Sequence, residues 1–189
     1  ADGTGRWLKL DLGAANAAAS GAGMAGFADD GEMMIRVRQA ARALGATPMD
    51  RPEDVEAPKD AAFRGQGDVL VVMTKSPSAT AQPANPRQGG PNRTGQIVRI
   101  LEAGGDHAGT SFGWTFFALG GDPASATARS SDGRSTASSW VDGRATTSGD
   151  RFACPDNVCF DGRGYVWVTT DGNDDVFDSH DGVFVMPVT

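Results

Sequence analysis

Residues 155–170, PDNVCFDGRGYVWVTT, combine a proline, an acidic residue, an amide, a valine, a glycine-rich turn and a β-rich run that ends in threonine. The same frame occurs at residues 52–74, PEDVEAPKDAAFRGQGDVLVVMT. Runs rich in β-branched and aromatic residues, bounded by glycine-rich turns, are typical of strands. The two prolines lie 103 positions apart, 155 minus 52, and a propeller blade takes roughly 40 to 50 residues. The repeat therefore predicts two blades of a β-propeller, or one blade with a long insertion.

Further strand-like runs extend this pattern over the rest of the chain, at 95–102, 110–121, 152–175 and 181–189. A complete propeller has about four to eight blades, and this chain has material for about three. The sequence therefore predicts a mainly β fold, a partial β-propeller that forms one section over residues 1–189. An ordinary hairpin within another β fold is the alternative explanation of the repeat.

One stretch alone has helical periodicity. Residues 31–45 carry apolar side chains near helical spacing, with Asp30 as the expected N-cap and Gly45 as the stop. Residues 1–30 are rich in glycine and alanine and predict a segment of low regularity. Blade strands and long Gly/Pro-rich loops are expected over 50–189, including one long excursion at 76–95.

Composition limits the class of function. A chain of 189 residues can form one domain with a core, and its 26 glycines indicate many turns. The net charge of -7 and the pI near 4.7 argue against nucleic-acid binding, which requires a basic surface. No apolar run reaches the roughly 18 residues of a membrane span. The opening residues lack signal-peptide features, which leaves the compartment open.

Cys154 and Cys159 are the only cysteines. On one extended segment they would point to opposite faces, with Cα atoms too far apart for a disulfide. We expect both to be buried small side chains or unreactive thiols.

The stretch MDRPEDVEAP, residues 49–58, is a first candidate site. Arg51 precedes Pro52, and the carboxylates of Glu53, Asp54 and Glu56 follow. Proline fixes its own φ and biases the preceding residue toward extended geometry, which would pre-order these side chains. Carboxylate oxygens suit hard cations such as Ca²⁺, and a nearby arginine can bind a phosphate. A solvated acidic turn after the helix is the alternative.

Residues 155–157, PDN, are a second candidate. Asn157 at the start of an inner strand could donate to a bound oxyanion, or bind a cation through its carbonyl oxygen. An Asx-turn, in which Asp156 and Asn157 bond their own backbone, is the alternative. Residues 169–175, TTDGNDD, are rich in oxygen ligands but lack the spacing of an EF-hand.

Several of these stretches together resemble the PhoX family of bacterial alkaline phosphatases. The resemblance runs over nearly the whole chain, and its motifs occur in order and at plausible spacing. They are FADDGEMMIRVRQAARALGATPMDRPEDVE at 27–56, ANPRQGGPNRTGQIVRILEAGGDHAGTSFGWTFFALGGDP at 84–123 and FACPDNVCFDGRGYVWVTTDGND at 152–174.

The resemblance implies a periplasmic or secreted phosphomonoesterase on a β-propeller, exported by the twin-arginine route, with a calcium and iron cluster. Arg51 would bind the substrate phosphate and Asn157 would contact it further. Glu53 would be an iron or calcium ligand, with Asp54 and Glu56 as additional metal ligands. Family members run to several hundred residues, so we expect a partial chain without the family's upstream cysteine.

The leading hypothesis is thus a metal-dependent phosphatase acting on phosphate monoesters, or a section of one. Its alternative is a catalytically incomplete propeller module that binds calcium or a protein partner. Open sheet edges, such as residues 69–73, would then favour self-association. A sugar-lactone hydrolase of another propeller type would share the PDN strand, but would not predict ANPR and RPED.

Overall fold

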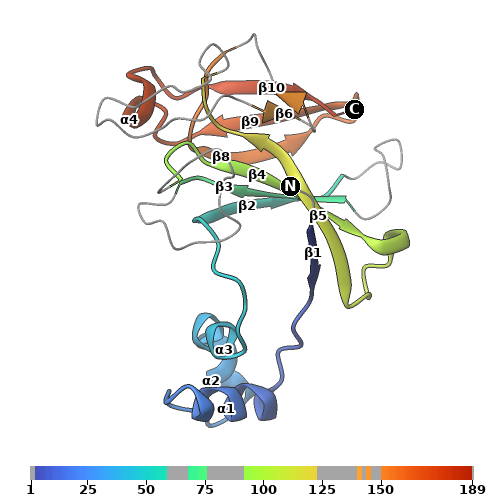
Figure 1. Cartoon of the computed structure of the whole chain (residues 1–189), viewed down its shortest axis with the longest axis vertical. Coiled ribbons are helices and arrows are strands. Elements are labelled where there is room, and N and C mark those ends of the chain that lie inside the picture. Colours follow the sequence, from blue (N-terminus) through green and yellow to red (C-terminus); the bar gives the residue numbers. More distant parts are fainter. Residues whose placement is uncertain are drawn as a thin grey trace. The chain divides into compact units, whose positions relative to one another are not determined.

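The computed structural model describes residues 3–58, 68–75, 92–122, 140–141, 144–145 and 150–188 (Figure 1). The chain divides into two compact units. The β unit consists of Ala1–Gly5 and Met49–Thr189, and the helical unit of Arg6–Pro48. The excursion expected at 76–95 lies mostly outside the described residues.

The first sheet of the β unit is an antiparallel meander. The strands β2 (Pro52–Glu56), β3 (Asp68–Met73), β4 (Gln96–Glu102) and β5 (Ser111–Leu119) pair in chain order, and a short 3-10 turn at Ala103–Gly105 joins β4 to β5. The sheet continues into β6 (Trp140–Val141) and β7 (Arg144–Ala145), and β1 (Gly3–Arg6) also pairs with β5. Because β3 pairs with β2 on one side and β4 on the other, residues 69–73 are not the open edge expected from the sequence.

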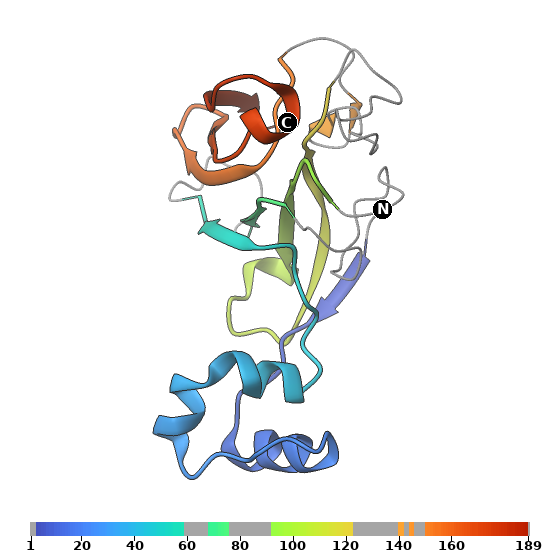
Figure 2. The same cartoon turned by 90° about the vertical axis from the view of Figure 1, so that its left-hand side faces the viewer.

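The second sheet has the order β10-β9-β8 and is also antiparallel. Its strands are β8 (Pro155–Phe160), β9 (Tyr165–Thr170) and β10 (Val183–Pro187), and the short helix α4 (Asp174–Phe177) lies in the connection from β9 to β10. The strand β8 lies beside β2 and β3 of the first sheet (Figure 2). The mainly β prediction is confirmed by these two sheets.

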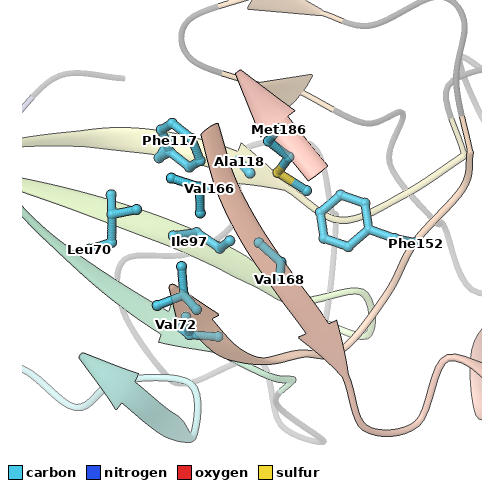
Figure 3. Packing of buried hydrophobic residues seen from close by; sticks show 10 residues of the cluster. Leu70, Val72, Ile97, Phe117, Ala118, Phe152, Val166, Val168 and Met186 are labelled. Atoms are coloured by element: carbon cyan, nitrogen blue, oxygen red, sulfur yellow. The ribbon is translucent and has the colours of Figure 1, made fainter. Parts of the chain in front are cut away.

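A hydrophobic core joins the two sheets (Figure 3). Alternation along each strand sends every second side chain inward. In β9, Val166 and Val168 are buried while Tyr165 and Trp167 are exposed. The first sheet contributes Leu70, Val72, Ile97, Phe117 and Ala118, the second contributes Val158, Val166, Val168 and Met186, and Phe152 comes from the segment before β8. This core packs the two sheets against each other, and the contact of β2 with β8 positions the polar residues described below.

The repeated sequence frame has a structural counterpart. β2 begins at Pro52 and β8 at Pro155, and each pairs antiparallel with the strand that follows it. In both pairs the register shifts between the proline and the valine three residues later, Val55 and Val158. Such bulges re-aim side chains where pairing is interrupted. Both copies therefore present irregular backbone at the same point, where the two strands meet.

The helical unit corrects the expectation of low regularity at 1–30. Residues Leu12–Gly21 form the helix α1, because alanine has the highest helix propensity and Asp11 caps the first turn, accepting from the Ala14 N–H at 3.0 Å. Ala15 and Ala19 are fully buried in a small core with Phe27. Alanine-rich composition here indicates close helix packing, not a loop.

The helix expected at 31–45 is two helices, α2 (Asp30–Ile35) and α3 (Val37–Ala43). Asp29, one residue earlier than expected, is the N-cap and accepts from the Glu32 N–H at 2.8 Å. The chain leaves helical geometry at Arg36, with φ of -102° and ψ of 33°. The Arg36 side chain also lies over the Phe27 ring and pairs with Glu32, which holds the break in place.

The two cysteines lie just before β8 and within it. Cys154 and Cys159 are both free, as predicted; of the two alternatives expected, burial or an unreactive thiol, burial holds for Cys154 and not for Cys159, which is exposed. The exposure of Cys159 follows from the alternation of side chains along β8, which has one face in the core and one in solvent.

Within the described ranges, no helix is both long and apolar enough to cross a membrane.

Candidate functional site: a charged cluster where the two sheets meet

Arg51 stands in a tight turn just before β2. Its φ is 49°, a left-handed conformation that is uncommon for a residue with a side chain. Its N–H donates to the Met49 carbonyl at 3.0 Å, and its own carbonyl accepts from the Thr74 N–H at 3.2 Å. The guanidinium is about half exposed and its Nη2 lies 3.1 Å from Glu53 Oε1. The arginine is thus fixed at its backbone and available at its head group.

Asp54 fastens the two sheets together. Its Oδ2 accepts from the Val158 N–H at 2.9 Å, across 104 positions of sequence, and its Oδ1 accepts from the Val55 N–H at 2.8 Å. Both carboxylate oxygens therefore have backbone partners. This arrangement fits a structural role for Asp54 better than the predicted metal ligation.

Several charged side chains near this contact shift the pKa of the Asp156 carboxyl. Burial raises the pKa of its carboxyl above the ordinary value, and the nearby carboxylates of Asp171, Glu53 and Asp54 raise it further, while Arg51 lowers it. Charges act on a carboxyl in this way only when they lie near it. Asp171, Glu53, Asp54 and Arg51 therefore lie near Asp156, at the ends of β2, β8 and β9.

A second ionic contact lies beside this group. Lys75, two residues after the end of β3, places its Nζ 2.6 Å from Asp175 Oδ2 in α4. Burial lowers the pKa of the Lys75 ammonium, but its hydrogen bond and charge interaction with Asp175 outweigh this effect and raise the pKa overall. A side chain on Gly172 would meet the Lys75 Nζ at 2.9 Å and the Cys154 Sγ at 3.5 Å. Glycine at 172 therefore leaves room for the lysine to reach its partner.

The loop after β9 is held by one carboxylate. Asp181 Oδ1 accepts from the Gly172 N–H at 2.9 Å, the Asn173 N–H at 2.8 Å and the Thr170 hydroxyl at 3.0 Å. These bonds, the one from Asn173 first, keep the pKa of Asp181 low. The oxygen-rich segment 169–175 is thus a fixed loop that positions Asp171 and Asp175.

Two further predicted site residues, Asn157 and Glu56, lie on β8 and β2. The Asn157 N–H donates to Thr169 Oγ1 at 3.2 Å, and the Thr169 hydroxyl in turn donates to Asn157 Oδ1 at 3.4 Å. The Asn157 side chain is thus oriented by the next strand. Glu56 is half-buried at the far end of β2, opposite Leu70, and no contact places it with Arg51.

Sequence reasoning missed three members of the cluster, Asp156, Asp171 and Lys75. Asp156 was recognised only as part of an Asx-turn, although it occupies the position of Glu53 in the repeated frame. Asp171 belongs to a stretch whose oxygen-rich composition was the available signal. A single lysine after a strand carries no such signal, and only the fold brings Lys75 to Asp175.

The oxygen and sulfur side chains near Arg51 have the chemistry of some metal ligands but not of others. In the part of the chain that the structure describes, no group of three or more His, Cys, Asp or Glu side chains could hold a metal ion. Glu53, Asp156 and Asp171 nevertheless supply hard oxygens whose repulsion a cation would relieve. Cys154 does not fit an iron ligand, because it is fully buried and burial raises the pKa of its thiol to about 11. Among the described residues, these side chains therefore do not form a complete site for either metal.

Replacing Asp156 with asparagine is expected to stabilise the calcium-free chain at neutral pH, by less than about 1 kcal/mol because the carboxyl is partly solvated. The unfolded carboxyl ionises near 3.8, whereas the pKa in the folded chain is raised. Ionisation therefore disfavours folding as the pH rises through the folded value, and the substitution removes that effect. Urea unfolding between about pH 3 and about pH 8 measures it.

The control for this prediction is Asp178→Asn, which removes the same charge from the exposed end of α4. The Asp156→Asn variant should gain stability with rising pH relative to this control. Equal pH profiles for the two variants would show that Asp156 does not sense the neighbouring carboxylates.

Comparison with known proteins gives a consistent picture. The family model described as alkaline phosphatase PhoX matches residues 1–186. The solved structure of Pseudomonas fluorescens PhoX in complex with vanadate, a transition state analogue, is similar at 26% sequence identity and a TM-score of 0.69. The match covers 98% of this chain and 30% of that chain. Among curated proteins no match is found. Because the family match covers nearly every residue, the chain belongs to the PhoX alkaline phosphatase family.

Proposed function

We propose that this chain provides part of the phosphate- and calcium-binding site of a metal-dependent phosphatase that hydrolyses phosphate monoesters. One observation carries the proposal: Arg51 pairs with Glu53 at 3.1 Å, and both side chains, with Asp171, shift the pKa of Asp156 where β2 meets β8. An arginine beside oxygen ligands suits a phosphate whose charge a cation shares. The similar solved protein binds vanadate, which supports the phosphate part.

Each residue would have a distinct role. The Arg51 guanidinium binds the phosphate oxygens, and the contact with Glu53 limits the directions in which it points. The Asn157 amide, oriented by Thr169, donates to the same phosphate. Glu53, Asp156 and Asp171 would each be available to supply part of the ligands of a calcium ion, which would bring positive charge that stabilises the phosphoryl group in the transition state. Asp54 keeps β2 on β8 and so maintains the geometry.

The wider setting of the site is part of the same proposal. The two antiparallel sheets with matching first strands suit neighbouring blades of a β-propeller, in which first strands line a central channel. Iron would require ligands other than those described, since Cys154 stays a buried thiol. A periplasmic or secreted location follows from the family resemblance and is proposed with it.

The test is release of phosphate from an aryl phosphate by this chain with calcium, before and after chelation. Replacing Arg51 with alanine is expected to lower kcat/KM by about 100-fold, because the main electrostatic contact to the phosphate is lost. The control is Arg38→Ala, which removes an exposed arginine from α3 of the helical unit. Calcium-dependent release that is insensitive to Arg51 would contradict its role.

A second candidate is a catalytically incomplete module that binds calcium or a protein partner. It is favoured by the absence, among the described residues, of any complete metal-binding group, and by a chain that spans 30% of the solved relative. Titration calorimetry separates the two candidates. Calcium binding that depends on Asp156, without phosphate release, supports the calcium-binding module, and no calcium binding contradicts both that module and the calcium-dependent phosphatase.

A further inference from the structure

Asp50, the residue before Arg51, is a buried carboxylate outside the charged cluster. It is only 3% exposed. Its Oδ2 accepts from Asn92 Nδ2 at 3.1 Å, and its Oδ1 has no hydrogen-bond partner among the described residues. Burying a carboxylate with so few hydrogen-bond donors lowers the stability of the fold. A structural or functional contribution of Asp50 must therefore offset this loss.

Asn92 connects Asp50 to the start of β4. Its Nδ2 also donates to Gln96 Oε1 at 3.3 Å, and its Oδ1 accepts from the Gly95 N–H at 3.1 Å. Gln96 is fully buried and its Nε2 lies 3.4 Å from Met73 Sδ, at the end of β3. Asp50 is thereby tied, across 42 positions of sequence, to the start of β4 and, through Gln96, to the end of β3, the strand that pairs with β2.

This connection bears directly on Arg51. The left-handed φ of 49° is retained only when the surroundings impose it. On its C-terminal side the turn is fixed by the Thr74 N–H bond to the Arg51 carbonyl. On its N-terminal side, the fixed point is the bond from Asn92 to Asp50. Together these bonds clamp the backbone of the arginine from both sides.

We propose that Asp50 and Asn92 form a buried brace that holds the Arg51 turn and so directs its guanidinium toward the phosphate. The inference rests on the proposed function, since it concerns the same anion site. Both are positioning residues, because they act through the backbone of Arg51 and lie in the core. The brace needs one donor and one acceptor at these two positions, and not a negative charge at residue 50.

The exchange of the two side chains tests this requirement. In Asn92→Ala the donor is lost. In the double variant Asp50→Asn with Asn92→Asp, the amide at 50 can donate to the carboxylate at 92, which still accepts from the Gly95 N–H. The bond from residue 92 to Gln96 Oε1 is lost, and a turn of the Gln96 amide lets its Nε2 donate to the new carboxylate instead. A calcium ligand or a proton-transfer group at residue 50 would not tolerate the exchange, whereas a brace would.

Two readouts are needed. Hydrogen exchange of the Thr74 amide, measured against the Val166 amide in the second sheet, reports on the Arg51 turn without any ligand. The dissociation constant of orthovanadate, measured by calorimetry with calcium, reports on the anion site. We expect Asn92→Ala to accelerate Thr74 exchange and weaken vanadate binding, each by about tenfold, and the exchanged pair to return both within about threefold of the parent chain.

The matched control is Val98→Ala, which removes buried apolar contacts on the other face of the first sheet. It should lower stability while leaving vanadate affinity and the ratio of Thr74 to Val166 exchange unchanged. Unchanged Thr74 exchange in Asn92→Ala would overturn the brace. So would weak vanadate binding by an exchanged pair whose Thr74 exchange is restored. If the parent chain binds no vanadate, the proposed function fails, and with it the link to phosphate, while Thr74 exchange still decides whether the brace exists.

Discussion

Replacing Gly95 with alanine is expected to lower the free energy of unfolding of the β unit by about 3 to 5 kcal/mol, the largest effect of any substitution considered. Gly95 has a φ of +74°, which disfavours any side chain. An added Cβ would also collide with the Thr74 carbonyl oxygen and lie 2.6 Å from the Met73 carbonyl and 2.5 Å from Pro155 Cδ. Backbone atoms cannot turn aside as a flexible side chain can.

The position explains why the effect should be large. Gly95 directly precedes β4, and its neighbours are the end of β3 and the start of β8. Any movement that admits the methyl group must therefore separate the two sheets at the candidate site. Total stability of a domain is about 5 to 15 kcal/mol, so the substitution removes a large share of it.

Gly104→Ala is the matched control. Gly104 has a similar φ of +66°, lies in the turn before β5, and has nothing within 4 Å of the added Cβ. It should lose only the conformational part, about 1 kcal/mol. Urea unfolding followed by tryptophan fluorescence compares the two variants. If both unfold at the same urea concentration, the close approach at Gly95 does not exist.

Iodoacetamide is expected to modify Cys159 at least about 100-fold faster than Cys154 in the folded chain near pH 8, because only the thiolate reacts. Burial raises the pKa of Cys154 to about 11, and the nearby Lys75 offsets only part of the rise. Its Sγ is enclosed and lies 3.6 Å from the Arg93 carbonyl. Cys159 is on the exposed face of β8.

Mass spectrometry of the alkylated chain measures this difference. Cys159→Ser should leave a protein that takes up no reagent until urea is added. The same raised pKa predicts a loss of stability as the pH rises from 9.0 toward 11, because the unfolded thiol ionises there and the folded thiol does not. Cys154→Ala should lack this loss, and rapid labelling of Cys154 in the folded chain would contradict its burial.

The strands could be predicted from the sequence because their signal is local. The runs at 68–74 and 155–170 are rich in β-branched residues and contain or follow glycine-rich turns, and they form β3, β8 and β9. The helix α1 was missed because alanine and glycine occur together at 14–26, and composition does not distinguish a packed helix from a loop. The burial of Ala15 and Ala19 against Phe27 is a tertiary effect.

Only part of the candidate site could be predicted from the sequence. Arg51 and Glu53 are neighbours in sequence, so their pairing could be anticipated. The structural role of Asp54 could not be anticipated, because it depends on a hydrogen bond from the Val158 N–H, which comes near Asp54 only when the chain folds. The same holds for Lys75 with Asp175, and for Asp50 with Asn92.

The contact between the sheets also has a consequence for the order of folding. Its bonds join residues far apart in the chain, 104 positions for Asp54 with Val158 and 100 for Lys75 with Asp175. Closing such long loops costs more entropy than forming the neighbouring hairpins of each sheet. We therefore expect the hairpins to form early and this junction to close last. In the folded chain this junction should be the first region to open. An anion or cation that binds there would therefore slow unfolding of the chain, although the junction contributes few residues to the hydrophobic core.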